Sequence, residues 1–288
     1  MTIRNSIYCF HQGGSDNSEL WYNTFDGFRW TGDARVTKTN MTGAPSVAVY
    51  NDKIYCFHQG SGNSGELWYN VFDGSNWEGD TRVPETGLSA SPCTVVYDNK
   101  IYCFHQGYGN NGELWYNVFD GSRWAGDTRV RDTGISAGPS IAVYNSKIYC
   151  FHQGSGDSGE LWYNTFDGFR WTGDTRVTKT NMTGAPSVAV YNDKIYCFHQ
   201  GSGNNGELWY NVFDGSNWEG DKLVPETGIS AGPSVAVYDN KIYCFHQGHG
   251  NDGELWYNVF DGSNWVGDTQ VSHTTMSASP AVVIAHLH

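Results

Sequence analysis

Apolar and polar residues alternate in short runs along the chain, and no run shows the spacing of a helix. One such run is Ser46–Tyr50, which is followed by Asn51-Asp52 and by a second alternating run, Lys53–Gln59. Asn and Asp tolerate the left-handed backbone of a two-residue turn, so this pattern predicts a β-hairpin.

Two further strands follow in the same stretch. The glycine-rich loop Gly60–Gly65 leads to an alternating run at Glu66–Phe72, and a turn at Asp73-Gly74 leads to a strand expected at Trp77–Val83. The loop Pro84–Ser91 then returns the chain to a new first strand. This stretch therefore predicts a unit of four antiparallel strands.

The unit is repeated six times. The string CFHQG starts at Cys9, Cys56, Cys103, Cys150, Cys197 and Cys244, and six steps of 47 residues cover 282 of the 288. All twelve Trp keep this register: Trp21/Trp30, Trp68/Trp77, Trp115/Trp124, Trp162/Trp171, Trp209/Trp218 and Trp256/Trp265. Residues 18–80 also match 159–221 at all but three positions. A three-unit half has therefore been duplicated, either naturally or by engineering.

Four antiparallel strands at a period in the forties predict an all-β, six-bladed β-propeller that forms a single domain over residues 1–288. The chain begins at the second strand of a unit, Ile7–Gln12, and ends on a first strand, Ala281–Ala285. The last strand is expected to pair with the N-terminal blade and close the ring, which leaves no exposed sheet edge there.

Charge and composition exclude several classes of protein. With 30 acidic and 17 basic residues the net charge is −13, which argues against nucleic acid as a partner. No apolar run is long enough for membrane insertion, and the opening MTIRNSIYCF lacks the character of a signal peptide. We expect a cytoplasmic protein, or one exported without a classical signal.

Cysteine usage predicts free thiols. Six of the seven Cys occupy one strand position, one in each blade, and are too far apart to pair. Cys93 and Cys103 lie on neighbouring strands, but Cys93 is expected opposite Phe104, which puts the two sulfurs on opposite faces.

Several repeated polar residues are expected on the rim that carries the longer loops. His58-Gln59 end the second strand, Glu66 and Trp68 open the third, and Arg82 closes the fourth. Trp offers an apolar face to the C–H side of a pyranose, while Glu and Gln bond hydroxyl groups. The predicted glycan-binding set is His11, Gln12, Glu19, Trp21, Arg35, His58, Gln59, Glu66, Trp68, Arg82, His105, Gln106, Glu113, Trp115, Arg129, His152, Gln153, Glu160, Trp162, Arg176, His199, Gln200, Glu207, Trp209, His246, Gln247, Glu254 and Trp256.

Each position also has a structural interpretation. The His set can serve only to hold strands through an Asp or a backbone carbonyl, and the Trp set can be core. Arg becomes Leu223 and Gln270 in the last two units, so only four sites have it. Because the six units are alike, the sequence presents no singular catalytic set, no metal-ligand cluster and no phosphate loop, and we expect neither enzyme activity nor a cofactor.

The order Cys-Phe-His-Gln, Gly-Glu-Leu-Trp-Tyr-Asn, Phe-Asp-Gly-x-x-Trp and Ser-x-x-Pro resembles the repeats of β-propeller lectins. It is most similar to the Aleuria-type fucose lectins and the Photorhabdus-type lectins, and more distantly to the tectonin group. The resemblance implies sugar sites in the grooves between blades. It places His58 or Gln59 where the family has Arg, Glu66 at its Glu, and Trp68 or Trp77 at its aromatic residue, and so it does not assign fucose.

The expected function is that of a multivalent lectin for a terminal neutral sugar (fucose, GlcNAc or galactose-type, methylated or not) on cell-surface glycans. Agglutination and a role in defence or recognition follow from several sites on one ring. The alternatives are a propeller that docks proteins on its long-loop rim and a symmetric scaffold without a ligand. The sequence does not determine the oligomeric state.

Overall fold

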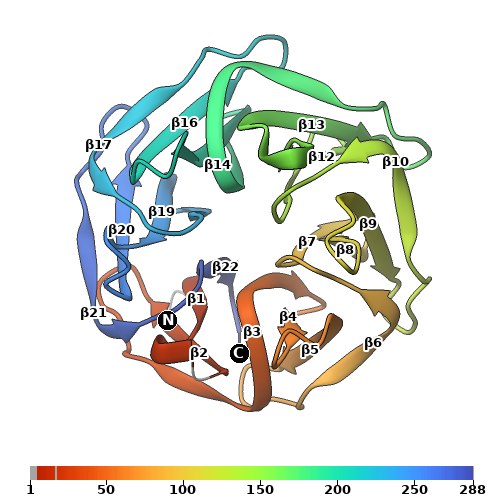
Figure 1. Cartoon of the computed structure of the whole chain (residues 1–288). Helices are drawn as coiled ribbons and strands as arrows, with labels where there is room; N and C mark the ends of the chain where they lie inside the picture. The colour runs from red at the N-terminus through yellow and green to blue at the C-terminus, as the bar shows by residue number, and fades with distance from the viewer. Residues whose placement is uncertain (1–4, 17, 288) are drawn as a thin grey trace.

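Strands dominate the computed structural model, which describes residues 5–16 and 18–287. They form six groups of four antiparallel strands around a centre, an arrangement that fits a six-bladed propeller (Figure 1). Within these residues, two short 3₁₀ turns occur, at Gly14–Asp16 and Ser155–Asp157. No helix in the described part of the chain is long and apolar enough to cross a membrane.

Within each blade, the strands are counted from the innermost to the outermost, and the blades are counted from the one that contains β1. The innermost strands of blades 1, 3, 4 and 6 are β22 (Ala281–Ala285), β7 (Cys93–Tyr97), β11 (Ser140–Tyr144) and β18 (Ser234–Tyr238). The second strands of blades 1 to 6 are β1 (Ser6–Gln12), β4 (Lys53–Gly60), β8 (Lys100–Gln106), β12 (Lys147–Gln153), β15 (Lys194–Gly201) and β19 (Lys241–Gln247).

The third strands, in the same order, are β2 (Glu19–Phe25), β5 (Glu66–Phe72), β9 (Glu113–Phe119), β13 (Glu160–Phe166), β16 (Glu207–Phe213) and β20 (Glu254–Phe260). The outermost strands of blades 2, 3, 5 and 6 are β6 (Thr81–Gly87), β10 (Thr128–Gly134), β17 (Lys222–Gly228) and β21 (Thr269–Thr275). The long strands β3 (Ala34–Tyr50) and β14 (Thr175–Tyr191) run from the outer edge of one blade to the inner edge of the next.

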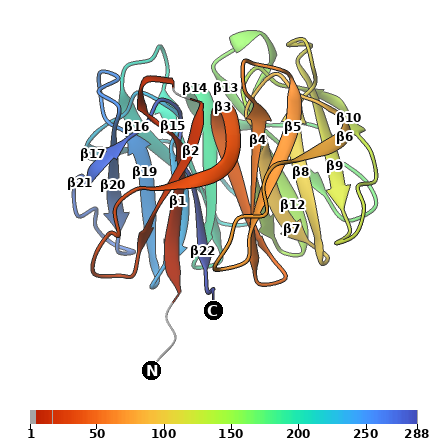
Figure 2. The same ribbon diagram turned by 90° about the horizontal axis from the view of Figure 1, so that it is seen from below.

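The two ends of the chain meet in one blade. The C-terminal strand β22 pairs antiparallel with β1, from Ser6 opposite Ala285 to Phe10 opposite Ala281. The start of β1 and the end of β22 lie on the same side of the disc, as Figure 2 shows. The pairing on which the expected closure depends is therefore present, and the strand β1 has a partner on each side.

The predicted hairpin turns have the expected backbone. Asn51 and Asp52 have φ of 48° and 58°, which is the left-handed pair of a two-residue hairpin. At the next turn, Asp73 accepts hydrogen bonds through Oδ1 from the backbone N–H groups of Ser75 and Asn76, at 2.8 and 2.7 Å.

The fourth strand differs from its prediction. We expected Trp77–Val83, but β6 spans Thr81–Gly87, and Trp77 contributes only a single bridge to Phe72. Gly79 has φ of 104° and donates its N–H to Asn70 Oδ1 at 2.9 Å, so the chain bends between Trp77 and the strand. Part of the expected return loop is therefore strand.

Aromatic residues fill the layers between blades, as the repeat of the second Trp predicts. Trp77 of blade 2 meets Phe10 of blade 1 edge-on, with ring centroids 5.9 Å apart. At the junction of blades 1 and 6, Trp30 and Phe245 make the same contact at 5.8 Å. The junction that joins the two chain ends is thus packed like the others.

All seven cysteines are free, as predicted. Cys93 lies opposite Phe104, and its neighbour Thr94 lies opposite Cys103. The two thiols consequently pack into different clusters: Cys103 lies between blades 2 and 3, and Cys93 lies beside Cys150 between blades 3 and 4.

These thiols should be unreactive in the folded protein. Burial raises the pKa of Cys93 to about 12 and the pKa of the six repeated cysteines well above the ordinary value, so the reactive thiolate is scarce at pH 8. We expect a disulfide reagent such as Ellman's reagent to label seven thiols only after denaturation. Cys93 is less buried than the others and should be the first to react. Rapid labelling of several thiols in the native protein would contradict this packing.

Candidate functional site

A carboxylate, an indole and a guanidinium lie together on the long-loop side of each of the first four blades. In blade 4, Glu160 opens β13 and Trp162 follows two residues later, so both side chains lie on one face of the strand. Arg176 is the cross-strand partner of Trp162 on β14. Strand alternation and strand pairing therefore bring the three side chains together.

Hydrogen bonds hold this constellation. Trp162 donates its Nε1–H to Glu160 Oε2 at 3.2 Å, and Arg176 Nη2 contacts Glu160 Oε1 at 2.9 Å. The Trp contact recurs at Trp115–Glu113 (3.2 Å) and Trp209–Glu207 (3.1 Å). The ion pair recurs at Arg35–Glu19 (2.9 Å), Arg82–Glu66 (3.2 Å) and Arg129–Glu113 (2.9 Å). Leu223 and Gln270 occupy the Arg position in blades 5 and 6.

The ion pair is open to solvent. The Glu160 and Arg176 side chains are 29% and 50% exposed. An ion pair at such a surface adds at most about 1 kcal/mol to stability. Its groups are therefore available to a ligand at little cost to the fold.

A hollow adjoins this constellation between neighbouring blades. In blade 4 it measures 330 Å³, which is at the small end of the range for small-molecule sites. Its lining comes from blade 4 (Gly154, Ser155, Ser158, Glu160, Trp162, Asp174) and from the outer strand of blade 3 (Asp132, Gly134). A hollow of 230 Å³ with corresponding residues lies between blades 1 and 2, beside Glu66 and Trp68. The structure thus joins the predicted Glu and Trp positions to an inter-blade groove.

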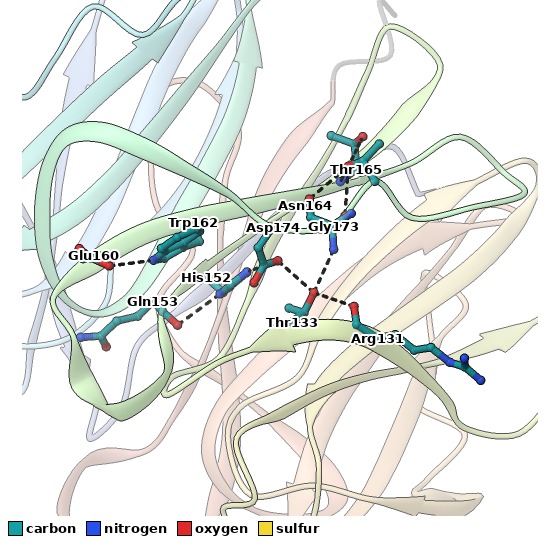
Figure 3. Close-up of polar contacts among 11 residues, drawn as sticks. Arg131, Thr133, His152, Gln153, Glu160, Trp162, Asn164, Thr165, Gly173 and Asp174 are labelled. Atoms are coloured by element: carbon teal, nitrogen blue, oxygen red, sulfur yellow. Dashed lines mark hydrogen bonds and ion pairs between the residues drawn. The ribbon is translucent and has the colours of Figure 1, made fainter.

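The six histidines lie elsewhere than we predicted. His11, His58, His105, His152, His199 and His246 have no exposed surface. His152 donates its Nε2–H to Asp174 Oδ1 at 3.3 Å, and its Nδ1 lies 3.3 Å from the Gln153 carbonyl oxygen (Figure 3). Burial keeps these rings from a ligand, so their assignment to the glycan-binding set is corrected in favour of the strand-holding alternative.

The glutamines also belong to the scaffold. Gln12, Gln106, Gln153, Gln200 and Gln247 are buried, and Gln59 is partly buried. Gln12 accepts the Gly43 N–H through Oε1 at 2.9 Å, and Gln106 donates to the Ile135 carbonyl at 3.2 Å. Each bond fixes a segment that leads to the next blade, so direct sugar contact through these side chains is corrected as well.

Sequence reasoning missed a set of linked hydrogen bonds, the relay, which joins two blades at each junction. Thr133 of blade 3 donates its hydroxyl to Asp174 of blade 4 at 2.9 Å and accepts from Asn164 Nδ2 at 2.9 Å, beside the His152 contact already described (Figure 3). The other five junctions join Thr39–Asp80, Thr86–Asp127, Thr180–Asp221, Thr227–Asp268 and Thr274–Asp33 at 2.8 to 3.2 Å.

The missed signal was a repeated Gly-Asp after the second Trp, at Asp33, Asp80, Asp127, Asp174, Asp221 and Asp268. Its partner Thr always belongs to the preceding blade. The Thr lies 41 residues earlier in the sequence at five junctions, whereas at the junction that joins the chain ends Thr274 comes after Asp33 in the sequence. Asp174 and Asp80 also line the two hollows, so one member of the relay reaches the groove in each case.

Solved structures share this fold. The fucose-specific lectin of Aleuria aurantia aligns with 14% identity over 96% of this chain and 94% of its own, with a TM-score of 0.70. AofleA of Arthrobotrys oligospora aligns with 11% identity over 99% and 90%, with a TM-score of 0.64. An α-L-arabinofuranosidase of Clostridium thermocellum also aligns, with 15% identity over 84% and 98% and a TM-score of 0.54.

The Aleuria protein is a six-bladed β-propeller that recognises fucose and has been crystallised with Fucα1-6GlcNAc. No protein-family model matches this sequence, and no curated protein matches it. The similarity, at these identities, is one of fold.

The relay predicts a stability effect that is separate from the groove. Replacing Thr133 by Val keeps the shape but removes the hydroxyl that accepts from Asn164 Nδ2 and donates to Asp174 Oδ1, which should lower the free energy of unfolding by about 1–3 kcal/mol. Chemical denaturation of the purified protein measures it. Thr128→Val on the same strand is the matched control, because Thr128 is exposed, and it should change stability by less than about 0.5 kcal/mol. Equal effects of both substitutions would contradict the role of the relay.

Proposed function

We propose that this protein is a multivalent lectin that binds a terminal neutral sugar in the grooves between its blades and acts without catalysis. The observation that carries the proposal is the hollow beside Glu160 and Trp162, which lies between blades 3 and 4 and has a counterpart between blades 1 and 2. The groups available there suit a sugar better than a reacting substrate.

The chemistry of the groove supports a neutral ligand. Trp162 is partly exposed and offers an apolar face to the C–H side of a pyranose. Glu160 and Asp174 carry carboxylate oxygens that accept hydrogen bonds from sugar hydroxyls. An anionic ligand would face these carboxylates and a protein with a net charge of −13.

The number of sites determines the apparent affinity for a surface that carries many glycans. A shallow site for one monosaccharide binds weakly, with a Kd on the order of 0.1–1 mM. Several copies on one rigid ring raise the apparent affinity for a glycan-dense surface by roughly 10²–10⁴. We therefore infer agglutination of glycan-bearing cells, with a role in recognition or defence, by a protein that is cytoplasmic or exported without a classical signal.

The fold similarity to the Aleuria lectin supports sugar binding and makes fucose one candidate. GlcNAc and galactose-type sugars, methylated or not, are the others, because the family's Arg is replaced here by His58, which is buried, or by Gln59, which is partly buried. The exposed Arg82 on the fourth strand pairs with Glu66 and is the cation nearest to that role.

A glycan array tests the proposal. Labelled wild-type protein should bind a narrow set of glycans that share one terminal sugar, and that sugar in millimolar amounts should block agglutination. Replacing the six groove glutamates (Glu19, Glu66, Glu113, Glu160, Glu207, Glu254) together by Gln should reduce the array signal at least tenfold, because each carboxylate that accepts sugar hydroxyls is lost.

Glu78→Gln combined with Glu219→Gln is the control, because these carboxylates pair with Lys53 and Lys194 outside the hollows. This variant should bind as the wild type does. An array without positives for a folded wild-type protein would overturn the proposed function and favour a protein-docking propeller.

A further inference from the structure

The six blade junctions differ at one loop position. The second residue of the glycine-rich loop is small in four blades, as Gly14, Ser61, Ser155 and Ser202. In blades 3 and 6 it carries a ring, as Tyr108 and His249. These two residues are 141 positions apart, which is half the ring.

Tyr108 reaches across the groove to the preceding blade. Its ring lies against Gly65, where an added Cβ would collide with the ring carbons. A Cβ on Gly87 of β6 would lie 3.1 Å from the Tyr108 Cβ. Both glycines are therefore needed to seat the ring.

His249 repeats this arrangement in the other half of the ring. Its imidazole lies against Gly206, and a Cβ on Gly228 would lie 2.9 Å from the His249 Cβ. The same pair of contacts thus occurs twice, with a different planar side chain in each case.

At three of the other four junctions, a residue with a side chain on the outer strand faces a small residue in the loop. Where the outer strand carries Asn40, Asn181 or Thr275, the loop residue is Ser61, Ser202 or Gly14. A Cβ on Gly14 would lie only 2.8 Å from Thr275 Oγ1, so a ring has no room there. The groove of blade 4 is the exception, because it combines a small loop residue, Ser155, with the glycines Gly112 and Gly134.

Tyr108 is not buried by this contact. Tyr108 stays 69% exposed, and it is one of the few large apolar residues on the surface. Trp115, which donates its Nε1–H to Glu113 Oε2, lies on the third strand of the same blade. The junction of blades 2 and 3 therefore carries a second exposed aromatic side chain, Tyr108, which lies against blade 2.

We propose that Tyr108 and His249 are specificity-determining residues that make these two grooves a second class of site. This inference rests on the proposed function. The planar side chain supports a second sugar residue, linked to the terminal one that binds beside Glu113 or Glu254. The four grooves without a ring hold the terminal sugar alone. The two extended sites lie on opposite sides of the ring and take an oligosaccharide.

Isothermal titration with matched sugars tests this division. The probes are methyl α-L-fucoside with Fucα1-6GlcNAc, GlcNAc with GlcNAcβ1-4GlcNAc, and galactose with N-acetyllactosamine. The pair whose terminal sugar binds is used for the variants. For the wild type we expect a disaccharide isotherm with two tighter sites per chain, about three- to tenfold tighter than the rest, which is the effect of one aromatic contact.

Substitutions at the loop position should remove or add tighter disaccharide sites. Tyr108→Ser with His249→Ser should remove the tighter phase and leave monosaccharide binding within about twofold of the wild type. Ser155→Tyr should raise the tighter phase from two sites to three, because Gly112 and Gly134 leave room for the ring. Ser61→Tyr, which meets Asn40, should add no tighter site. Thermal denaturation verifies that each variant is folded.

The outcomes separate the two proposals. A wild type that binds monosaccharide and disaccharide with one affinity at all sites, or a tighter phase that survives in the double Ser variant, overturns this inference and leaves the lectin function intact. A folded wild type that binds none of the six probes and no glycan on an array overturns both.

Discussion

The hydrogen-bond relay at each blade junction is the constraint on which the rest of the structure depends. Its Thr hydroxyl belongs to one blade, while the Asp, His and Asn that bond together around it belong to the next, as at Thr133 and Asp174. A buried polar group without a partner costs about 1–3 kcal/mol, so a blade satisfies its polar core only when its neighbour is in place. The junction of Thr274 with Asp33 extends this dependence to the two ends of the chain.

The relay also determines where a ligand site can form. Asp174 is bonded by His152 and Thr133 on one side and lines the groove on the other. The position of this carboxylate in the groove is therefore fixed by the same contacts that hold the blades together. Glu160 and Trp162 line the same hollow, and Arg176 lies opposite Trp162 on the neighbouring strand β14.

The repeated scaffold and the variable loops have different tasks. The buried His, Asn, Thr and Asp are identical in all six blades because every junction has the same polar groups to satisfy. The loop position of Tyr108 faces solvent and changes between blades, and it carries a ring only where the neighbouring outer strand has a glycine, as at Gly87 and Gly228. A ring with one scaffold can thus carry grooves of more than one kind.

The sequence by itself determined the all-β class, the six units and the turns, because strand alternation and the Asn51-Asp52 pair are local signals repeated six times. It also predicted the neighbouring Glu160, Trp162 and Arg176, since alternation and pairing within one blade place them. Only the tertiary structure decided which repeated polar residues are buried. His152 and Gln153 are as regular in the sequence as Glu160, but the folded ring buries them. The partnership of Thr133 and Asp174 was invisible for the same reason, because residues 41 apart meet only when two blades pack together.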